Sequence, residues 1–381
     1  MAFQLTDIKK VAIIHDWLTG MRGGERVLEE LLLLFPQADI FTLVYDRDRV
    51  SNLISSHRIY ESSLVKLPFA RKHFRTLLPL FPWAIESFEL KGYQLVVSSS
   101  HCVAKGVIPP PDALHVSYVH SPMRYVWDMR SEYLNGNDTT EFKRGIAGFA
   151  THYLRNWDAS SACRVDRFIA NSGHVRNRII KYYRRDAEVI HPPVEVDQFR
   201  PGEGRGGYFL TVSALVPYKR IDLAIEACER LGRPLKIIGD GPEYSKLRDL
   251  AGKNTEFLGS VDFKDLPGIY ADALAFIHPA EEDFGIAPLE AQAAGRPVIA
   301  YGRGGALETV ITHGQNPTGV FFAEPTVESL SEIIKNFDRL AYNPTDARHN
   351  AEQFAPPVFR RKIEAFITDS WQRFSGGEAL R

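Results

Sequence analysis

The sequence predicts an α/β protein made of two doubly wound, parallel-sheet domains. Three observations support this prediction: the chain has 381 residues, its apolar runs are short and continuous, and helical patterns separate these runs. Because a domain usually holds about 100–200 residues, the chain is too long for one ordinary core. Continuous apolar runs are typical of strands that a parallel sheet buries on both faces. Strands that alternate with helices in both halves therefore predict two such sheets.

Short apolar runs supply the strand candidates in chain order. In the first half they are Val11–His15, Ile40–Val44, Leu95–Ser98, Leu114–His120, Arg167–Ala170 and Glu188–His191. In the second half they are Tyr208–Val212, Leu235–Gly239, Thr255–Gly259, Leu274–His278 and Pro297–Tyr301. Between them lie helical patterns such as residues 222–231, where apolar side chains recur at helical spacing. The order of the strands within each sheet is left open by this pattern.

A stretch rich in proline and glycine marks the boundary between the two domains. Pro192 and Pro193 end the last strand candidate of the first half, and residues 201–207 hold five Pro and Gly residues. The tail predicts a helix that ends near Gly376 and packs back on the first domain. The expected parts are residues 1–195, 196–355 and 356–381.

The charge balance argues against a polyanionic partner. Lys and Arg number 46 and Asp and Glu 47, which gives a formal net charge of −1. Residues 1–195 carry 25 basic and 21 acidic side chains, whereas residues 196–381 carry 21 and 26. Neither a dense basic stripe nor a known nucleic-acid-binding module accompanies this mild asymmetry. We therefore expect no nucleic acid partner.

The beginning of the chain and its cysteines predict a cytoplasmic protein. The first ten residues show no long apolar stretch before a cleavage site, and the longest apolar runs are far shorter than a membrane-spanning helix of about 20 residues. Cys102, Cys163 and Cys228 are widely spaced and form no C-x-x-C pair. Each is expected to be a small core residue of a reduced protein.

Residues 277–290 carry the strongest local signal for a functional site. A predicted strand ends at His278, a loop follows, and a helix begins with Pro288 in its first turn. Glu282 lies in the loop and Glu290 in the first helical turn. Backbone N–H groups at a helix start can bind an anion. Those expected to do so here belong to Phe284, Gly285 and Ile286. The alternative is a structural loop whose two acids only complement the helix dipole.

This segment and several others resemble one enzyme family. Residues 282–290 (EDFGIAPLE) resemble the E-x7-E signature of family 4 retaining glycosyltransferases, which have the GT-B fold of two Rossmann-like domains facing a central cleft. Essentially the whole chain fits the family in order. The matching segments are residues 15–24, 118–122, 170–172, 208–220, 237–242, 257–259 and 304–310. The pattern most resembles bacterial mannosyltransferases that use GDP-mannose to build cell-surface polysaccharides such as the O-antigen of lipopolysaccharide.

The resemblance implies roles for residues of the second domain. Glu290 would hydrogen-bond the nucleotide ribose, and Glu282 would contact the sugar hydroxyls near C3. Lys219 and Arg220 are candidate cations for the diphosphate, whose charge must be neutralised during transfer. The family usually has an arginine where this chain has Ala214, and Arg220 is its candidate replacement. The alternative for the two cations is a solvated pair at a helix start.

The resemblance also implies roles in the first domain. His120 would hydrogen-bond the sugar or the leaving group across the cleft, although a lone histidine after a strand is more often structural. Gly23 and Gly24 lie in a loop between the first strand and a helix, where glycine lets the backbone approach a ligand. Gly241 is a further candidate donor contact in the second domain, although neither a dinucleotide fingerprint nor a P-loop is present.

Residues 64–78 mix basic and apolar side chains. Such a segment can lie on an anionic membrane surface and meet a lipid-linked acceptor. The basic residues expected to contact this surface are Arg71, Lys72 and Arg75. The alternative is an ordinary amphipathic helix that packs on the sheet of the first domain.

We expect a retaining hexosyltransferase that moves mannose from GDP-mannose to a glycan or lipid-linked acceptor, in the cytoplasm or on the inner face of the cell membrane. In the route proposed for the family, the departing phosphate oxygen helps to deprotonate the acceptor hydroxyl. Neither a cofactor nor a metal ion is expected. Asp46 and Asp48 match the D-x-D pattern of metal-dependent transferases but are interpreted as loop acids. The alternatives are a nucleotide-sugar epimerase and a non-catalytic nucleotide-sugar-binding protein.

Overall fold

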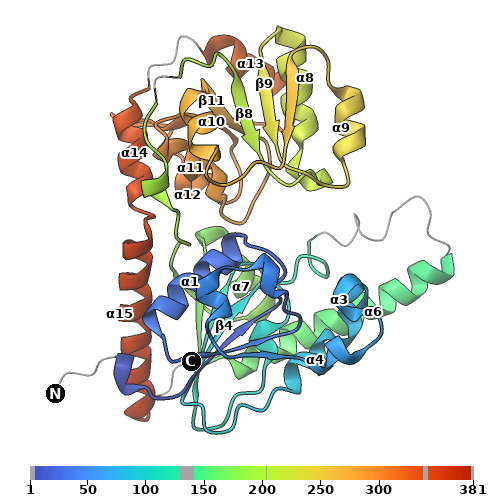
Figure 1. The fold of residues 1–381 in the computed structure, drawn as a ribbon, viewed down its shortest axis with the longest axis vertical. Coiled ribbons are helices and arrows are strands. Elements are labelled where there is room, and N and C mark those ends of the chain that lie inside the picture. Colours follow the sequence, from blue (N-terminus) through green and yellow to red (C-terminus); the bar gives the residue numbers. More distant parts are fainter. Residues whose placement is uncertain (1–4, 129–140, 203, 338–341, 379–381) are drawn as a thin grey trace. The chain divides into compact units, whose positions relative to one another are not determined.

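The computed structural model describes residues 5–128, 141–202, 204–337 and 342–378. The chain divides into two compact units (Figure 1): the first comprises Met1–Pro192 and Phe359–Arg381, and the second comprises Pro193–Val358. The first boundary lies three residues before the expected one. Val194 and Val196 belong to the core of the second unit, where the Val194 N–H donates to the Phe354 carbonyl at 2.9 Å.

The first unit contains a seven-stranded parallel sheet with the order β3-β2-β1-β4-β5-β6-β7. Its strands are β1 (Val11–His15), β2 (Asp39–Thr42), β3 (Ile59–Glu61), β4 (Leu95–Ser100), β5 (Leu114–Val119), β6 (Arg167–Ala170) and β7 (Glu188–Val189). Successive residues of β1 enter different cores, since Val11 and Ile13 pack in one cluster and Ala12 and Ile14 in another. This burial on both faces explains the continuous apolar runs in the sequence.

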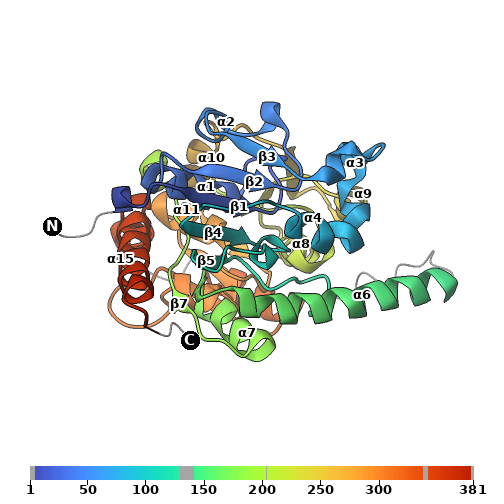
Figure 2. The ribbon, with the colours of Figure 1, turned by 90° about the horizontal axis from the view of Figure 1, so that it is seen from below.

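Helices cover both faces of this sheet. They are α1 (Gly23–Leu34), α2 (Asn52–Ser55), α3 (Ala70–His73), α4 (Phe81–Glu86), α6 (Glu141–Ser161), α7 (Gly173–Tyr183) and α15 (Pro356–Ser375). Phe359, Ile363 and Ile367 of α15 join the core formed by α1 and the sheet. The C-terminal helix thus packs on the first unit, although its sequence follows the second. Figure 2 shows α6 as a long helix that extends beyond the sheet.

The second unit contains a six-stranded parallel sheet with the order β10-β9-β8-β11-β12-β13. Its strands are β8 (Phe209–Val212), β9 (Leu235–Ile238), β10 (Thr255–Gly259), β11 (Ala275–His278), β12 (Val298–Tyr301) and β13 (Gly319–Phe322). Its helices are α8 (Ile221–Leu231), α9 (Tyr244–Leu250), α10 (Leu266–Asp272), α11 (Ile286–Ala293), α12 (Ala306–Thr309), α13 (Val327–Asn336) and α14 (Pro344–Glu352). Local signals set several helix ends: Thr326 caps α13, and Gly232 ends α8 with φ 62°.

Several local expectations differ from the structure. The edge strands β3 and β13 were not among the predicted strands. Residues 64–78 form no single amphipathic helix. A left-handed residue, Phe69 with φ 60°, separates the 3-10 turn at Ser63–Lys66 from α3, and a further 3-10 segment follows. Cys163 is exposed rather than buried in the core. Within the described ranges, every helix is too short or too polar to cross a lipid bilayer.

Candidate functional site

The strand order of each sheet reverses at one point. In the first unit the reversal lies between β1 and β4, and in the second unit it lies between β8 and β11. Doubly wound sheets bind ligands beyond the carboxyl ends of the strands at such a reversal. The residues that follow these strands are therefore the candidates for a site in each unit.

In the second unit, Lys219 and Glu282 meet at the reversal. Lys219 ends the short 3-10 turn Pro217–Lys219 that follows β8, and Glu282 lies in the loop that follows β11. The Lys219 ammonium forms an ion pair with Glu282 Oε1, and both side chains are largely buried. The structure thus brings together two residues that are separated by more than sixty positions in the sequence.

His278, at the end of β11, lies beside this ion pair. Its Nε2 is 3.8 Å from Glu282 Oε1 and has no hydrogen-bond partner within the described part of the chain. Burial lowers the pKa of His278, although the charge of Glu282 opposes this shift. A Cβ at Gly285 would lie 3.5 Å from this nitrogen, which is itself buried. The neutral ring thus packs beside the ion pair.

Two glycines hold the loop that contains Glu282. A Cβ at Gly304 would lie 2.3 Å from the Glu282 carbonyl oxygen, and one at Gly305 would lie 2.3 Å from Phe284 Cα. The Gly305 N–H donates to the Glu282 carbonyl at 2.8 Å. Only glycine permits this approach of two backbones. Gly285 turns the chain into α11 with φ 88°, so Ile286 begins that helix.

Glu290 is held by a buried tyrosine. It lies in α11, and the Tyr270 hydroxyl from α10 donates to Glu290 Oε2 at 2.9 Å. Burial and the neighbouring carboxylate raise the pKa of Tyr270 well above its usual value, so the hydroxyl stays protonated. The structure therefore fixes the direction of one carboxylate oxygen and leaves Glu290 partly accessible.

Arg220 and Gly241 have local partners. The Arg220 guanidinium donates to both Asp222 carboxylate oxygens at 3.1–3.2 Å, so its charge meets an acid two residues away. A Cβ at Gly241 would lie 2.3 Å from the Leu215 carbonyl oxygen, so this glycine packs on the turn that follows β8. Among the two predicted cations, Lys219 is the one that lies beside Glu282.

In the first unit, three residues from adjacent strands form a hydrogen-bonded chain. The register pairs His15 with Ser99 across β1 and β4, and His120 directly follows β5. Ser99 Oγ lies 3.1 Å from His15 Nδ1 and 2.8 Å from His120 Nε2. The Asn171 amide donates to the His120 carbonyl at 2.9 Å and holds its backbone. His120 therefore belongs to a built polar cluster at the strand reversal.

The N-terminal turn of α1 borders this cluster. A Cβ at Gly24 would lie 3.4 Å from His15 Cε1 and 3.8 Å from His120 Nε2. Glu25 Oε1 lies 3.9 Å from His15 Nε2, and Glu25 Oε2 accepts from the Arg22 N–H at 2.9 Å. Gly23 begins the helix itself. The first turn of α1, which holds both predicted glycines, thus lies close to the two imidazoles.

Asp16 holds the loop that follows β4. Its carboxylate accepts hydrogen bonds from four consecutive backbone N–H groups at 2.6–2.9 Å, and its Oδ2 lies 3.1 Å from His101 Nδ1. These four N–H groups belong to His101, Cys102, Val103 and Ala104. Burial lowers the pKa of His101, so the ring is neutral beside this carboxylate.

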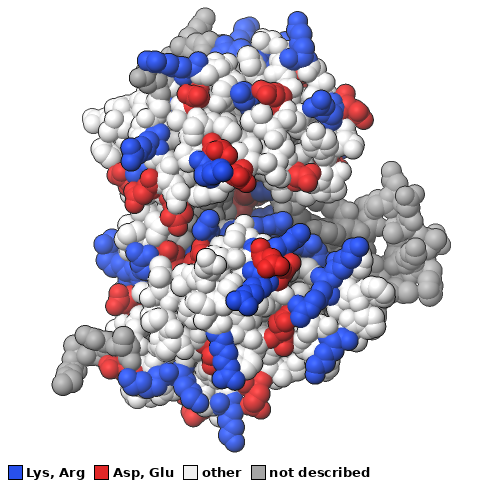
Figure 3. Space-filling model, viewed as in Figure 1, with Lys and Arg blue, Asp and Glu red and all other residues white. Residues whose placement is uncertain are grey.

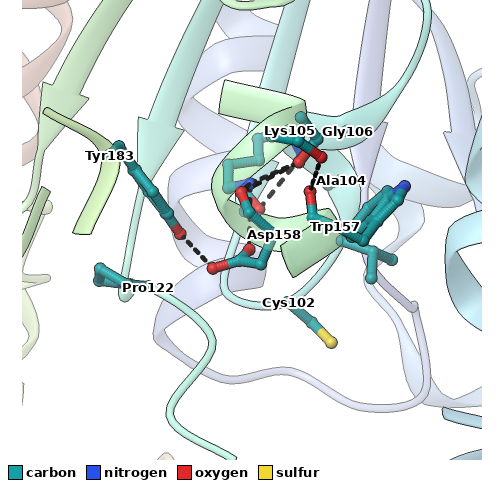
Figure 4. A network of polar contacts seen from close by, with 12 residues as sticks. Cys102, Ala104, Lys105, Gly106, Pro122, Trp157, Asp158 and Tyr183 are labelled. Atoms are coloured by element: carbon teal, nitrogen blue, oxygen red, sulfur yellow. Dashed lines mark hydrogen bonds and ion pairs between the residues drawn. The ribbon is translucent and has the colours of Figure 1, made fainter. Parts of the chain in front are cut away.

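The far end of this loop is fixed by a buried lysine. Lys105 pairs with Asp158 Oδ1 at 3.0 Å and donates to the Asp158 carbonyl and to Ser161 Oγ. Figure 4 shows Lys105 reaching α6 while Tyr183 approaches the same carboxylate, to which its hydroxyl donates at 2.9 Å. Burial lowers the pKa of Lys105, against the opposing charge of Asp158. Breaking a buried pair by removing one partner costs about 3–5 kcal/mol, so we assign this network to loop positioning.

The basic residues of the segment at residues 64–78 differ in their contacts. Arg71 donates to both Glu61 carboxylate oxygens at 2.8–2.9 Å and to the Tyr45 carbonyl at 2.8 Å. Arg75 lies over the Phe74 ring at 4.9 Å. Lys72 and Phe69 are exposed, and Phe69 keeps 81% of its surface in solvent. Asp46 caps a 3-10 turn through the Asp48 N–H, which agrees with the interpretation of both as loop acids.

Comparison with family models shows which family this chain belongs to. Residues 21–198 match the model described as Glycosyltransferase Family 4, and residues 195–354 match the model described as Glycosyl transferases group 1. The chain belongs to the family 4 glycosyltransferases. The predicted family is thereby confirmed from matches that extend over both units of the chain.

Curated relatives match parts of this chain. An uncharacterised glycosyltransferase of Methanocaldococcus jannaschii is 30% identical over 210 residues, which cover 53% of this chain and 58% of that protein. The GDP-mannose-dependent alpha-(1-6)-phosphatidylinositol monomannoside mannosyltransferase of Mycobacterium tuberculosis is 33% identical over 195 residues, which cover 43% of this chain and 50% of the relative. The chain thus spans about half the length of these curated relatives.

A solved structure confirms the architecture of this chain. The crystal structure of Anabaena Alr3699/HepE in complex with UDP is similar with a TM-score of 0.65 and 16% identity, over 94% of this chain and 100% of that chain. At this identity the likeness establishes the fold alone. The expected GT-B class, with two doubly wound parallel sheets, is confirmed.

Proposed function

We propose that this protein transfers mannose from GDP-mannose, with retention of configuration, to a glycan or lipid-linked acceptor. The observation that supports this best is the Lys219–Glu282 pair at the strand reversal of the second unit. The pair joins a cation and a carboxylate of the two segments that most resemble the family's donor site. A diphosphate and a hexose present the two chemistries that such a pair binds.

The donor diphosphate finds positive groups belonging to the chain itself. Lys219 supplies a full charge, and the start of α11, an eight-residue helix, supplies backbone N–H groups and the positive end of its dipole. When the diphosphate binds Lys219, Glu282 becomes available to hydrogen-bond sugar hydroxyls. That transfer needs no metal ion stays a prediction.

The reaction balances without an external reactant. The bond between the sugar C1 and the phosphate oxygen breaks, and a bond forms between C1 and the acceptor oxygen. The acceptor hydroxyl proton passes to the departing phosphate oxygen, so the products are the mannosylated acceptor and GDP. The positive groups around Lys219 stabilise the charge that develops on the leaving diphosphate.

Mannose and GDP are the donor components that the relatives favour. The mycobacterial relative is named as GDP-mannose-dependent, and its match covers 43% of this chain. The HepE structure contains UDP instead. We therefore assign GDP-mannose from the sequence relatives, and we place the product in cell-surface polysaccharide synthesis.

Transfer by two variants tests this function. Lys219→Ala and Glu282→Ala are each expected to lower mannosyl transfer from GDP-mannose at least about 100-fold, because each removes charge or hydrogen bonding from the donor site. The measurement is radiolabelled mannose transferred to lipid and glycan extracts, with circular dichroism as the control for folding. Lys236→Ala is the matched control, since its ammonium faces Glu256 and the Tyr208 ring.

Three results would contradict the proposal. Turnover like that of the unmodified protein in both variants would remove the two residues from the site. Net formation of an epimer from the donor alone would favour an epimerase. Donor binding without transfer to any acceptor would favour a non-catalytic binding protein.

We also propose that the first unit meets an anionic membrane, on the inner face of the cell membrane, where a lipid-linked acceptor would lie. Two exposed aromatic residues support this: Phe69 keeps 81% of its surface in solvent, and Trp83 keeps 55%. Lys72 and Arg75 lie between them in the sequence. Aromatic and basic side chains together favour the headgroup region of anionic lipids.

A further inference from the structure

The series of side chains from Glu25 through His15 and Ser99 to His120 has a defined direction of hydrogen-bond donation. We propose that the buried carboxylate of Glu25 sets the tautomer of His120, so that His120 Nδ1 is a hydrogen-bond acceptor for a ligand hydroxyl. Glu25, His15 and Ser99 are then positioning residues for His120. That this ligand is the sugar donor rests on the proposed function, whereas the tautomer does not.

The hydroxyl of Ser99 makes the two imidazoles dependent on each other. It lies within hydrogen-bond distance of His15 Nδ1 and of His120 Nε2, at 3.1 Å and 2.8 Å. A hydroxyl has one proton to donate. If it donates to His15, it must accept from His120, and the reverse also holds. The protonated nitrogen of one ring therefore decides that of the other.

Glu25 decides which of these two hydrogen-bond arrangements is present. His15 is fully buried, and its Nε2 has no hydrogen-bond partner within the described ranges, but it lies 3.9 Å from Glu25 Oε1. A nitrogen lone pair facing a buried carboxylate is repelled, whereas an N–H facing it is attracted. Burial raises the pKa of Glu25, but the nearby His15 ring and a backbone hydrogen bond lower it by more, so the carboxyl stays ionised. His15 therefore carries its proton on Nε2.

The proton positions then follow along the chain. His15 Nδ1 is unprotonated and accepts from Ser99, so Ser99 Oγ accepts from the Nε2–H of His120. Burial lowers the pKa of His120, with further lowering by His101 and His15, to about 3, so the ring is neutral near pH 7. A neutral ring protonated at Nε2 has a bare Nδ1. This nitrogen has no hydrogen-bond partner within the described residues, and the His120 side chain is partly exposed.

Other charged and titratable groups around the cluster do not reverse these proton positions. Asp16 faces His101 at 3.1 Å and is already bound by four backbone N–H groups. His101 lies 6.2 Å from His15 and 6.4 Å from His120 between ring centroids, and its own pKa is lowered by burial. Arg22 contributes its backbone N–H to Glu25 Oε2, which prevents the carboxylate from turning away from His15.

The test is the tautomer of His120 in the full-length protein. Histidine labelled with ¹⁵N distinguishes protonated from bare ring nitrogens by two-bond ¹H–¹⁵N correlations, and His120→Gln identifies the His120 signals by their loss. At neutral pH we expect His120 and His15 to be protonated only on Nε2. A proton on His120 Nδ1, or an imidazolium pattern for His15, would overturn the inference.

Glu25→Gln provides the decisive variant. Its amide oxygen keeps the acceptor for the Arg22 N–H, while its amide nitrogen can donate to His15 Nε2. The chain then reverses, and the proton of His120 is expected on Nδ1. A folded Glu25→Gln protein with an unchanged His120 pattern would overturn the inference.

Ser99→Ala and Ser98→Ala form a matched pair of controls. Ser98 Oγ lies 2.9 Å from His115 Nε2, so the same kind of buried Ser–His contact exists one residue away without a link to His120. Ser99→Ala is expected to leave a mixture of His120 tautomers, and Ser98→Ala is expected to leave the pattern unchanged. Equal effects of both substitutions would overturn the inference as a general packing response.

The transfer rate separates this inference from the proposed function. If His120 Nδ1 accepts from a donor hydroxyl, Glu25→Gln lowers kcat/KM for GDP-mannose about tenfold, since that hydroxyl meets an N–H instead. The tautomer pattern alone decides the inference about Glu25. A protein with the expected pattern but no transfer would reject the proposed function and retain the positioning chain.

Discussion

At the scale of single residues, the two glutamates of the E-x7-E segment have different environments. Glu282 pairs with Lys219 and lies beside a neutral His278, whereas Glu290 accepts from the buried Tyr270 hydroxyl. The charge of Glu282 is neutralised by Lys219, which a bound diphosphate can attract away from the carboxylate. The second is oriented by a donor that has no charge. This difference agrees with distinct roles for the two carboxylates toward the sugar and the nucleotide.

Tyr270→Phe tests the orientation of Glu290. Because the tyrosine is fully buried, phenylalanine fits its space, and the variant removes only the hydroxyl that donates to Glu290 Oε2. We expect GDP to bind about fivefold more weakly, which corresponds to a loss of about 1 kcal/mol for one hydrogen bond. Isothermal titration calorimetry with GDP measures this change.

Tyr208→Phe is the matched control for that experiment. Its hydroxyl donates to the Ile269 carbonyl at 2.8 Å and has no contact with Glu290. Nucleotide affinity is expected to stay within twofold of the unmodified protein. Equal affinities for GDP in both variants would show that Tyr270 does not orient Glu290.

Residues with a sequence motif were predictable, and their partners from other strands were not. Lys219, Glu282 and His120 were predicted because each follows a strand within a recognisable segment. Ser99 and Tyr270 lie in no motif, since Ser99 becomes important only through the register that pairs it with His15. The serine run at the end of β4 is a polar end to an apolar strand, which is the one sequence signal that could have indicated Ser99.

At the scale of elements, loops at the site are held by groups inside the protein. The loop after β4 is held by Asp16 at one end and by Lys105 at the other. The loop after β11 is held by two glycines that let its backbone contact a neighbouring loop. Such loops keep their shape before a ligand binds, which lowers the ordering cost of binding.

The segment at residues 64–78 was only partly predictable. Its composition indicated a basic and apolar surface, but one helical pattern was expected where three short helical pieces occur. The left-handed conformation of Phe69 breaks the pattern and leaves its ring exposed. No sequence pattern indicates that a phenylalanine adopts the left-handed conformation, because this conformation is uncommon for residues other than glycine and asparagine.

Charge reversal in this segment tests the membrane contact. Lys72→Glu combined with Arg75→Glu is expected to weaken binding to phosphatidylglycerol vesicles at least about 30-fold, because each basic residue near an anionic surface contributes about 1 kcal/mol. Vesicle sedimentation measures the bound fraction. Arg71 is excluded from the variant because a glutamate there would face Glu61.

The control uses two lysines that precede the amino ends of β1 and β4. Lys10→Glu with Lys91→Glu changes the net charge by the same amount, and both positions are exposed. Binding by this control is expected to stay close to that of the unmodified protein. Equal losses of vesicle binding in both double variants would show that only net charge matters, and would reject a defined membrane-binding surface.

At the scale of the whole molecule, the net charge of −1 conceals two different halves. The first half has an excess of four basic residues and the second an excess of five acidic ones. Figure 3 shows Lys and Arg interspersed with Asp and Glu on the face in view. The proposed diphosphate site thus lies in the more acidic half, so donor binding depends on Lys219 and the start of α11 rather than on net charge.

The architecture was predictable because strand–helix alternation is a strong signal. The strand order was not, since the reversals beside β1 and β8 arise from which strands pair rather than from their composition. Those reversals nevertheless bring the predicted residues of each unit together. The first domain boundary lies three residues before the expected one, because Val194 and Val196 complete the core of the second unit.

In the proposed function, the second unit binds its nucleotide sugar through Lys219. Thermal unfolding of the unmodified protein with GDP-, UDP- and ADP-sugars tests it most directly. We predict that GDP-mannose at about 100 times its Kd stabilises the protein by about 2.7 kcal/mol and raises the melting temperature by several degrees. Lys219→Ala should lose this rise at the same concentration. No rise with any nucleotide sugar, or an equal rise in Lys219→Ala, would contradict the account.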